Sequence, residues 1–400
     1  MEQNAALYNH DETPVRYGFN NPFAPPPTTG PRNLRQVIPA GKGRFTKGEK
    51  GDKEYLDRIR SGQRCGIKSA LALLNREHSR DMTKPSVGVI VGGGPSLQDR
   101  VGDLRRLVVH GAKTLAVNKS HDWLLKRGLP CHYAALLDPK EWVADYITAN
   151  VSPETIRRAG KLWVAPTYLI ASQCHEKTIS KFKGSTKAYI WHAAAGLGEG
   201  DILRDEFPGE PWVLLAGGSV VGLRGVGLLY GLGFREMHLF GIDGSAKMPE
   251  GKELRAIFSE FEKAGMVKLD PGASDETLRE RLAVLVEKNI NLPEPVNAIL
   301  KTSLYAYAKP HIDPTWKAFE VKLNTGWNRA FLSNHHMARS VYEFEDSMKH
   351  WDSEIKAGKM EPFTVKVHGD PEQSAIAMVA AGMGIHADPK ENEKYGKSPP

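Results

Sequence analysis

Residues 86–97 read SVGVIVGGGPSL, and this stretch decides the fold class. The apolar run 86–91 is short and ends at three consecutive glycines, which indicates a buried β-strand. Pro95 and Ser96 come next, and proline suits the first turn of a helix because its missing N–H costs nothing there. Apolar residues then recur at helical spacing from Leu97. The stretch therefore predicts a strand, a glycine turn and a helix.

The same alternation continues along the chain. Further strands are predicted at 114–117, 133–137, 162–165, 188–191, 212–215 and 237–241, with helical segments between them. Strands that alternate with helices form a mostly parallel sheet with helices on both faces. We therefore expect an α/β domain of this kind at residues 85–250.

The remaining chain is predicted to form three further parts. Residues 1–84 are an N-terminal arm, rich in Asn and Pro at its start and partly disordered, with a helical lead-in at about 63–77. Residues 251–370 are a smaller, mostly helical lid or acceptor region, and residues 371–400 are a C-terminal tail whose last dozen residues are polar and frayed.

The lid region carries its own periodic patterns. Residues 251–300 are expected to be helical, and strands are expected at 319–323 and 363–367. A helix starting near Asn334 is predicted to bury a stripe formed by Met337, Val341, Phe344 and Met348.

Composition limits the class of protein. The 400 residues are 40% hydrophobic and 25% charged, with a mean hydropathy of −0.41, and no apolar run is long enough for a membrane span. Three cysteines are too few for a disulfide framework, and the first thirty residues show no secretory signal, so we expect a cytoplasmic protein. The net charge of +7 permits polyanionic partners. The basic segment 41–60 is either a solvated mixed-charge linker or a nucleic-acid contact.

The glycine turn is the first candidate site. Gly92, Gly93 and Gly94 let a ligand approach the backbone closely, and Pro95 and Ser96 open a helix whose N–H groups attract phosphate. The segment is neither a dinucleotide fingerprint, since Leu97 replaces the third glycine, nor a Walker loop. A tight turn without ligand is the alternative.

Polar residues follow three other predicted strands. Asn118 can donate to a phosphate or a base, or cap the next helix. Asp138 can hold a divalent metal or a ribose hydroxyl, or only shape a turn, and Asp243 is a further carboxylate on the same edge. Parallel sheets bind ligands beyond the carboxyl ends of their strands.

Two more segments complete the candidate set. Gly217, Gly218 and Ser219 form a second strand–glycine–helix junction, and glycines within the following helix let it pack close to the sheet. His335 and His336 begin a predicted helix, where either imidazole can act as a general base. The absence of H-E-x-x-H, G-x-S-x-G and C-x-x-C patterns disfavours metalloprotease, hydrolase-triad and redox functions.

The order of these motifs resembles the MptE-like superfamily, which includes archaeal hydroxymethylpterin pyrophosphokinases and motility-associated-factor glycosyltransferases. The resemblance covers about residues 86–250 and rests on GGGPSL, on AVNKSHDWLLKRGLPCHYAALLDP, and on AGGSVVGLRGVGLLYGLGFREMHLFGIDGS. The series also resembles bacterial sialyltransferases, which share a GPSL loop, a strand-end asparagine, a glycine-serine junction and a G-I-D strand end. The chain also has the character of a phage-encoded member, which would act in the host cytoplasm.

The resemblance implies that residues 85–250 form a Rossmann-like nucleotide-binding domain. It implies a transferase that binds a nucleotide-activated donor, either a CMP-sugar, another nucleotide sugar or ATP, with Mg²⁺ as a candidate cofactor. It implies roles for residues at matching positions: Gly94, Pro95 and Ser96 border the phosphates, Asn118 contacts the nucleotide, Gly218 and Ser219 touch the base or sugar, Asp243 closes the pocket, Asp138 binds metal, and His335 or His336 acts as base. The tyrosines that sialyltransferases place on the leaving phosphate have no clear match in the sequence.

Three functions follow as expectations. The first is a glycosyl or pyrophosphoryl transferase. The second is a phage enzyme that hypermodifies hydroxymethylated DNA bases and holds DNA through residues 41–60. The third is a non-catalytic nucleotide-binding module. A homo-oligomer is compatible with all three.

Overall fold

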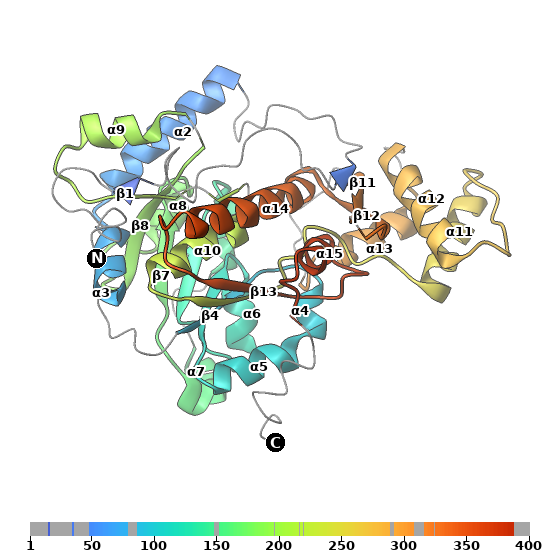
Figure 1. Ribbon diagram of the computed structural model, residues 1–400, viewed down its shortest axis with the longest axis horizontal. Helices are drawn as coiled ribbons and strands as arrows, with labels where there is room; N and C mark the ends of the chain where they lie inside the picture. Colours follow the sequence, from blue (N-terminus) through green and yellow to red (C-terminus); the bar gives the residue numbers. More distant parts are fainter. Residues whose placement is uncertain are drawn as a thin grey trace.

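The structure is a computed structural model that describes residues 15–16, 34–35, 48–78, 86–147, 152–195, 197–215, 217–218, 220–288, 292–307, 316–323 and 325–387. Its centre is a parallel sheet covered by helices (Figure 1). Within the described residues the strands of this sheet are β1 (Val15–Arg16), β3 (Lys68–Ser69), β4 (Val87–Val91), β5 (Lys113–Val117), β6 (Tyr133–Leu136), β7 (Thr167–Ala171), β8 (Ala188–Ala193), β9 (Val213–Leu215), β10 (Glu236–Phe240) and β13 (Thr364–His368).

The strand order places a reversal of direction at the middle of the sheet. The order is β1-β9-β8-β7-β6-β5-β4-β10-β13, with β3 beside β8, and all the pairings are parallel. From β4 the chain builds outward through β5 to β9, and it then returns to add β10 on the other side of β4. The carboxyl ends of β4 and β10 therefore form a topological switch point, where open α/β sheets bind their ligands.

Helices cover both faces of the sheet and bury its strands, which explains why the strands are apolar. The first group, in chain order, is α2 (Gly48–Gln63), α3 (Ala70–His78), α4 (Ser96–Asp99), α5 (Val101–Val109), α6 (Ser120–Lys126), η1 (Glu141–Tyr146), α7 (Pro153–Ala159), η2 (Gly160–Leu162), α8 (Glu176–Ser180) and α9 (Glu199–Glu206). The strands are continuously apolar because both of their faces are covered. The α/β, Rossmann-like class that the sequence predicts is confirmed.

Helix α10 (Val221–Gly231) joins β9 to β10 and is buried along its whole length. As predicted, its glycines bring it close to the sheet. A Cβ on Gly225 would lie 3.3 Å from side-chain carbons of Ile90 and Leu115. Because α10 starts above the carboxyl edge, it brings the second glycine junction next to the switch point.

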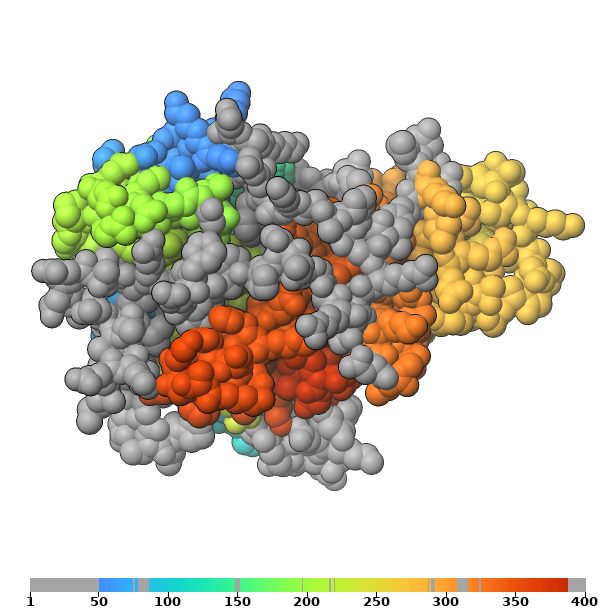
Figure 2. Space-filling view, turned by 45° about the horizontal axis from the view of Figure 1, so that its top comes forward, coloured from blue at the N-terminus to red at the C-terminus, as the bar shows by residue number. Residues whose placement is uncertain are grey.

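A second, smaller core lies to one side. It contains α11 (Gly251–Lys263), α12 (Asp275–Lys288) and α13 (Glu294–Ser303), packed on β11 (Trp316–Lys322) and β12 (Asn328–Asn334). These two strands and β2 (Leu34–Arg35) form an antiparallel sheet. Figure 2 shows the helices, in yellow and orange, projecting from one end of the molecule. This part agrees with the predicted helical region 251–300.

Two C-terminal helices return the chain to the parallel sheet. Helix α14 (His335–Lys356) runs from the small sheet back across the large one (Figure 1), and α15 (Ala375–Gly382) packs against it. The predicted stripe on α14 is confirmed for three of its four residues, because Val341 and Phe344 are fully buried and Met348 nearly so, whereas Met337 is only partly buried. Strand β13 pairs with β10 inside the large sheet. The predicted boundary at residue 250 therefore leaves out a strand of the first domain, and the predicted tail contains a buried helix.

Two predicted elements are wrong. The strand expected at 162–165 lies instead at β7, because Pro166 has no N–H to donate to a central ladder and the strand begins after it. The helix expected at 63–77 is divided by a turn at Gly66, whose φ is +80°. Part of the segment assigned to an arm is the long helix α2, whose Ile59 is fully buried.

Among the described residues, no helix combines the length and apolarity that a membrane crossing needs. The described part of the basic segment makes contacts within the molecule. Arg60 pairs with Glu206 of α9 at 2.7 Å, and α2 and α9 lie side by side in Figures 1 and 2. Residues 41–47 lie outside the described residues.

Candidate functional site

The candidate site lies at the switch point, where the loops after β4, β5 and β10 meet. The first glycine loop packs directly on the loop after β10. The N–H of Gly92 donates to the Phe240 carbonyl at 2.7 Å, and the N–H of Gly94 donates to the Gly241 carbonyl at 2.8 Å. A Cβ on Gly92 would lie 2.9 Å from the Gly241 carbonyl carbon, with the oxygen closer still. These glycines therefore allow two backbone segments to meet.

The side chain of Asp243 lies against the start of α4, whose N-cap residue is Pro95. Its Oδ2 accepts the N–H of Ser96 at 2.9 Å. Burial raises the pKa of the Asp243 carboxyl, while the hydrogen bond from the Ser96 N–H opposes that rise. The amide that the sequence assigns to a phosphate is thus bonded to a carboxylate in this structure.

Gly93 is covered by the segment that follows α13. A Cβ on Gly93 would lie 2.8 Å from Cζ of Tyr307, and the carbonyl of Gly93 accepts the N–H of Ala306 at 2.9 Å. The hydroxyl of Tyr307 lies 3.1 Å from Oγ of Ser120. Burial raises the pKa of this phenol, which stays protonated at neutral pH.

The second glycine junction lies on the same edge. Gly217 and Gly218 have φ values of +123° and +93°, which only glycine adopts readily. The side chain of Ile242 lies between the two junctions, since its Cδ1 is 2.5 Å from a Cβ built on Gly222 and also meets one built on Gly92. Ser219 lies outside the described residues. The structure therefore brings both glycine segments to one place, with an apolar side chain between them.

Charged groups surround the second junction. The carboxylate of Glu343 lies 2.9 Å from a Cβ built on Gly218, and it pairs with Arg339 at 2.7 Å. The buried guanidinium of Arg224 donates to the carbonyls of Leu215 and Ala194, at the ends of β9 and β8. Burial lowers the pKa of Arg224. This arginine fixes the strand ends from which the junction starts.

Three buried oxygens at the edge have no hydrogen-bond partner within the described residues. They are Oγ of Ser96, Oδ1 of Asn118 and Oδ1 of Asp243, and they follow the adjacent strands β4, β5 and β10. The hydroxyl of Tyr146 is a fourth such atom nearby. Buried polar atoms are nearly always hydrogen-bonded, so a cluster of unsatisfied ones calls for an explanation, such as a ligand.

Asn118 has φ +49° and is the one non-glycine residue of the described chain with a positive φ. Asparagine tolerates this conformation better than most residues do. Its N–H donates to the Ala135 carbonyl at 3.0 Å, so β6 holds the turn in place. The ammonium of the next residue, Lys119, lies 5.0 Å from the ring centre of Tyr146 and 5.8 Å from that of Tyr307.

Asp138 follows β6, and its Oδ1 accepts the N–H of Lys140 at 3.1 Å. That bond is typical of the turn aspartate that the sequence left as an alternative. No group of three His, Cys, Asp or Glu side chains in the described ranges is arranged to hold a metal ion. A metal at Asp138 would need further ligands from a bound substrate.

His335 and His336 open α14 and are exposed. Asn334 caps the helix by accepting the N–H of Met337 at 2.9 Å, and its Nδ2 donates to the hydroxyl of Tyr305 at 3.4 Å. Tyr305 thus joins the start of α14 to the segment over the glycine loop. Desolvation, followed by the charges of His336 and nearby cations, lowers the pKa of His335.

The sequence did not identify Lys119, Tyr146, Tyr305 and Tyr307 as neighbours. The tyrosines lie in segments without strand or helix periodicity, and only the fold brings them to one edge. The pattern Tyr-Ala-Tyr-Ala at 305–308 directly after a predicted helix is the one signal that could have drawn notice.

The fold and this edge define a Rossmann-like α/β protein with its candidate site at the switch point. Residues 67–247 match the family model described as 6-hydroxymethylpterin diphosphokinase MptE-like. The predicted resemblance to that superfamily is confirmed over these residues.

One similar solved structure is that of MAf glycosyltransferase from Magnetospirillum magneticum AMB-1, with a TM-score of 0.41 and 14% identity. The match covers 78% of this chain and 36% of that chain, so the present chain spans about a third of its neighbour. Comparison with curated protein sequences gives no match.

Proposed function

We propose that this protein is a transferase that uses a nucleotide-activated donor bound at the carboxyl ends of β4, β5 and β10. The observation that carries the proposal is the set of unpartnered buried oxygens of Ser96, Asn118 and Asp243 at three adjacent strand ends. The MptE-like match over residues 67–247 supports the choice of a transferase.

We assign the binding of the donor's nucleotide to these three oxygens. Asn118 presents an amide, which pairs with the donor and acceptor edge of a base or with a ribose hydroxyl. Asp243 accepts hydroxyl or amino donors through Oδ1 while Oδ2 stays on Ser96. Ser96 Oγ can donate and accept.

The donor's phosphates are assigned to Lys119 rather than to the glycine loop. The N–H groups of Gly92, Gly94 and Ser96 are already bonded within the molecule, whereas Lys119 brings a positive charge to the same edge. The phenol of Tyr146, buried and without a partner in the described residues, offers a neutral donor beside it. A cation and fixed donors at the leaving group stabilise the charge that develops on it.

The acceptor's hydroxyl is assigned to the start of α14. The lowered pKa of His335 keeps its imidazole neutral at pH 7, which a general base requires. The base takes the acceptor proton as the acceptor oxygen bonds to the donor. In a glycosyl transfer the sugar–phosphate bond breaks and a nucleoside phosphate leaves. In a pyrophosphoryl transfer from ATP, AMP leaves, and Mg²⁺ held by the phosphates and Asp138 would neutralise the charge.

A binding experiment tests the donor site. We expect at least one of the CMP-, UDP- and GDP-linked sugars, ATP and GTP, with or without Mg²⁺, to raise the melting temperature of the full chain. The variant Asn118→Gly keeps the positive φ without strain and removes the amide. We expect this variant to melt normally and to bind the donor at least tenfold more weakly. Unchanged donor affinity in Asn118→Gly would refute the placement.

The same experiment separates the other functions. Binding of a nucleotide with no turnover of any donor would support a non-catalytic module. Salt-dependent binding of duplex DNA, tested by anisotropy, would support the DNA-modifying version.

A further inference from the structure

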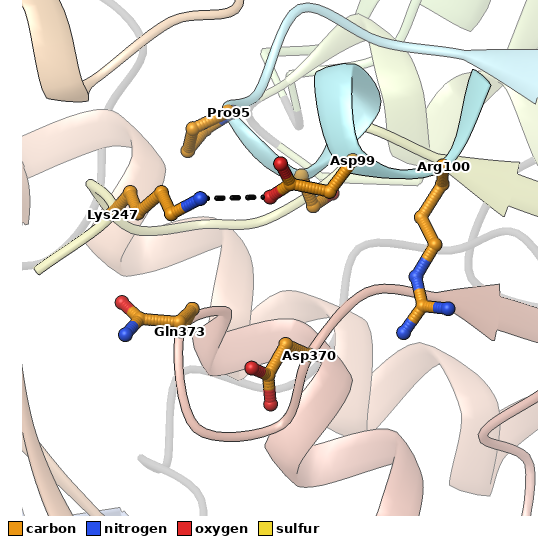
Figure 3. Close-up of a pocket in the computed structure, with 7 residues that line it drawn as sticks. Pro95, Asp99, Arg100, Lys247, Asp370 and Gln373 are labelled. Carbon is orange, nitrogen blue, oxygen red and sulfur yellow. Dashed lines mark hydrogen bonds and ion pairs between the residues drawn. The ribbon is translucent and has the colours of Figure 1, made fainter.

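A hollow beside the first glycine loop adjoins the donor site proposed above and shares Ser96 with it. It has a volume of about 210 Å³ and lies between the start of α4, the loop after β10 and the loop after β13. We call it the α4 hollow. The side chains used below are Ser96, Asp99, Arg100, Lys247, Asp370 and Gln373, and Figure 3 shows Lys247 and Arg100 on opposite sides with Asp370 between them.

Arg100 and Asp370 both line this hollow. The Arg100 guanidinium forms a long ion pair with Asp103, at 3.6 Å, and makes no hydrogen bond within the described residues. The Oδ1 of Asp370 accepts the N–H of Glu372 at 2.9 Å. Among the described residues no ion pair joins Arg100 to Asp370. Opposite charges that share a hollow and remain apart leave room for a ligand between them.

Lys247 adds to the ligand-binding capacity. It pairs with Asp99 at 2.9 Å, which uses one of its three N–H donors. Ser96 also lines the hollow, but its Oγ is the atom assigned above to the donor's nucleotide. Gln373 is held by two hydrogen bonds, because its Oε1 accepts the N–H of Met248 at 2.9 Å and its Nε2 donates to Glu250.

A second hollow of about 470 Å³ adjoins the first and shares Asp99 and Lys247 with it. It extends to Thr302 and Tyr305. Tyr305 contacts Asn334, the residue before His335. The two hollows therefore lead from Arg100 toward the start of α14.

We propose that these hollows bind a phosphorylated polyol, such as a sugar phosphate, as the acceptor of the transfer proposed above. Its phosphate accepts hydrogen bonds from Arg100 and Lys247. Its hydroxyl groups donate to Asp370 and lie along the second hollow toward Tyr305. The role of the bound molecule as an acceptor rests on the proposed function, whereas its binding to the hollows does not.

Chemical complementarity selects this ligand class. Arginine and lysine only donate hydrogen bonds, and ionised carboxylates only accept them. A neutral sugar leaves Arg100 with only its 3.6 Å ion pair to Asp103, and inorganic phosphate leaves Asp370 facing another negative charge. A sugar phosphate satisfies both groups, and charge-assisted bonds of this kind are the strong ones.

Calorimetric titration of the full chain tests the proposal. The probes are glucose 6-phosphate, glucose 1-phosphate, ribose 5-phosphate and glycerol 3-phosphate, with glucose and inorganic phosphate as comparison ligands. We expect at least one phosphorylated probe to bind ten times more tightly than glucose or phosphate. Arg100→Gln and Asp370→Asn should each weaken that binding at least tenfold. Arg105→Gln, an exposed arginine of α5, is the matched charge control and should change it less than twofold.

The proposal is overturned if none of the four probes binds, if inorganic phosphate binds as tightly as the best probe, or if Arg100→Gln and Asp370→Asn both leave binding unchanged while their melting temperatures match the wild type. Asn118→Gly separates this proposal from the donor site. It should lose nucleotide binding and keep sugar-phosphate binding. Nucleotide binding without sugar-phosphate binding would refute the α4 hollow alone, and the reverse would refute the donor site alone.

Discussion

Replacing Gly92 with alanine is the most direct test of what the first glycine loop does. Gly92 ends β4 and lies against the end of β10. Its φ is not in the left-handed region, so alanine meets no torsional penalty there. Any effect of the substitution therefore comes from the space that the new methyl group occupies.

The structure sets the size of the effect. The methyl carbon would lie 2.9 Å from the Gly241 carbonyl carbon and closer still to the oxygen, whereas ordinary contacts begin at 3.4 Å. The carbonyl cannot retreat easily because it accepts the N–H of Gly94. Overpacking costs about 1–3 kcal/mol and a lost hydrogen bond about 1 kcal/mol, so we expect a loss of roughly 3 kcal/mol in the free energy of unfolding.

Urea unfolding followed by tryptophan fluorescence measures this change. The control is Gly102→Ala in α5, where a Cβ meets nothing within 4 Å. It should stabilise the protein by about 0.5–1 kcal/mol, because alanine loses less backbone entropy in a helix than glycine does. If Gly92→Ala unfolds like the wild type but loses nucleotide binding, the glycine is kept for a ligand and our packing argument is wrong.

Burial and the charge of Glu345 raise the pKa of Asp346 to about 6. The protonated carboxyl therefore contributes free energy of unfolding that is fully present below about pH 4 and is lost as the pH rises through 6. In urea titrations Asp346→Asn should raise the free energy of unfolding at about pH 7.5 by about 1 kcal/mol after solvent screening, with little change near pH 4. Arg224→Met should cost about 3 kcal/mol, because it removes a buried, bonded charge; an unchanged urea midpoint would contradict this. His335→Ala combined with His336→Ala should abolish turnover and keep donor affinity, as a rate assay and a titration show; retained turnover would rule out a base there.

Local pattern was sufficient for much of the fold. The apolar run of β4 and the glycines after it predict a strand and a turn, since a strand buried on both faces must be apolar throughout. The stripe on α14 predicts the helix and its buried face, and Asn334 caps it as the sequence order suggests. Pro166 was the missed signal in β7, because its lack of an N–H fixes where that strand begins.

Other features depended on partners that are distant in sequence. The placement of β13 beside β10 joins residues more than a hundred positions apart. The short apolar pattern of β13 is compatible with the large parallel sheet and with the small antiparallel sheet, so the pattern alone does not assign the strand to either. The same holds for Tyr307, which covers Gly93 from a segment without periodicity.

The sequence alone determined that this protein is an α/β protein with polar and glycine-rich residues at the carboxyl ends of its strands, because strand periodicity and turn chemistry act between near neighbours. Only the tertiary structure decided which groups those residues meet. It placed Asp243 on the Ser96 amide, and within the described residues it left Arg100 and Asp370 lining one hollow without an ion pair between them, because burial and charge pairing depend on contacts across the whole chain.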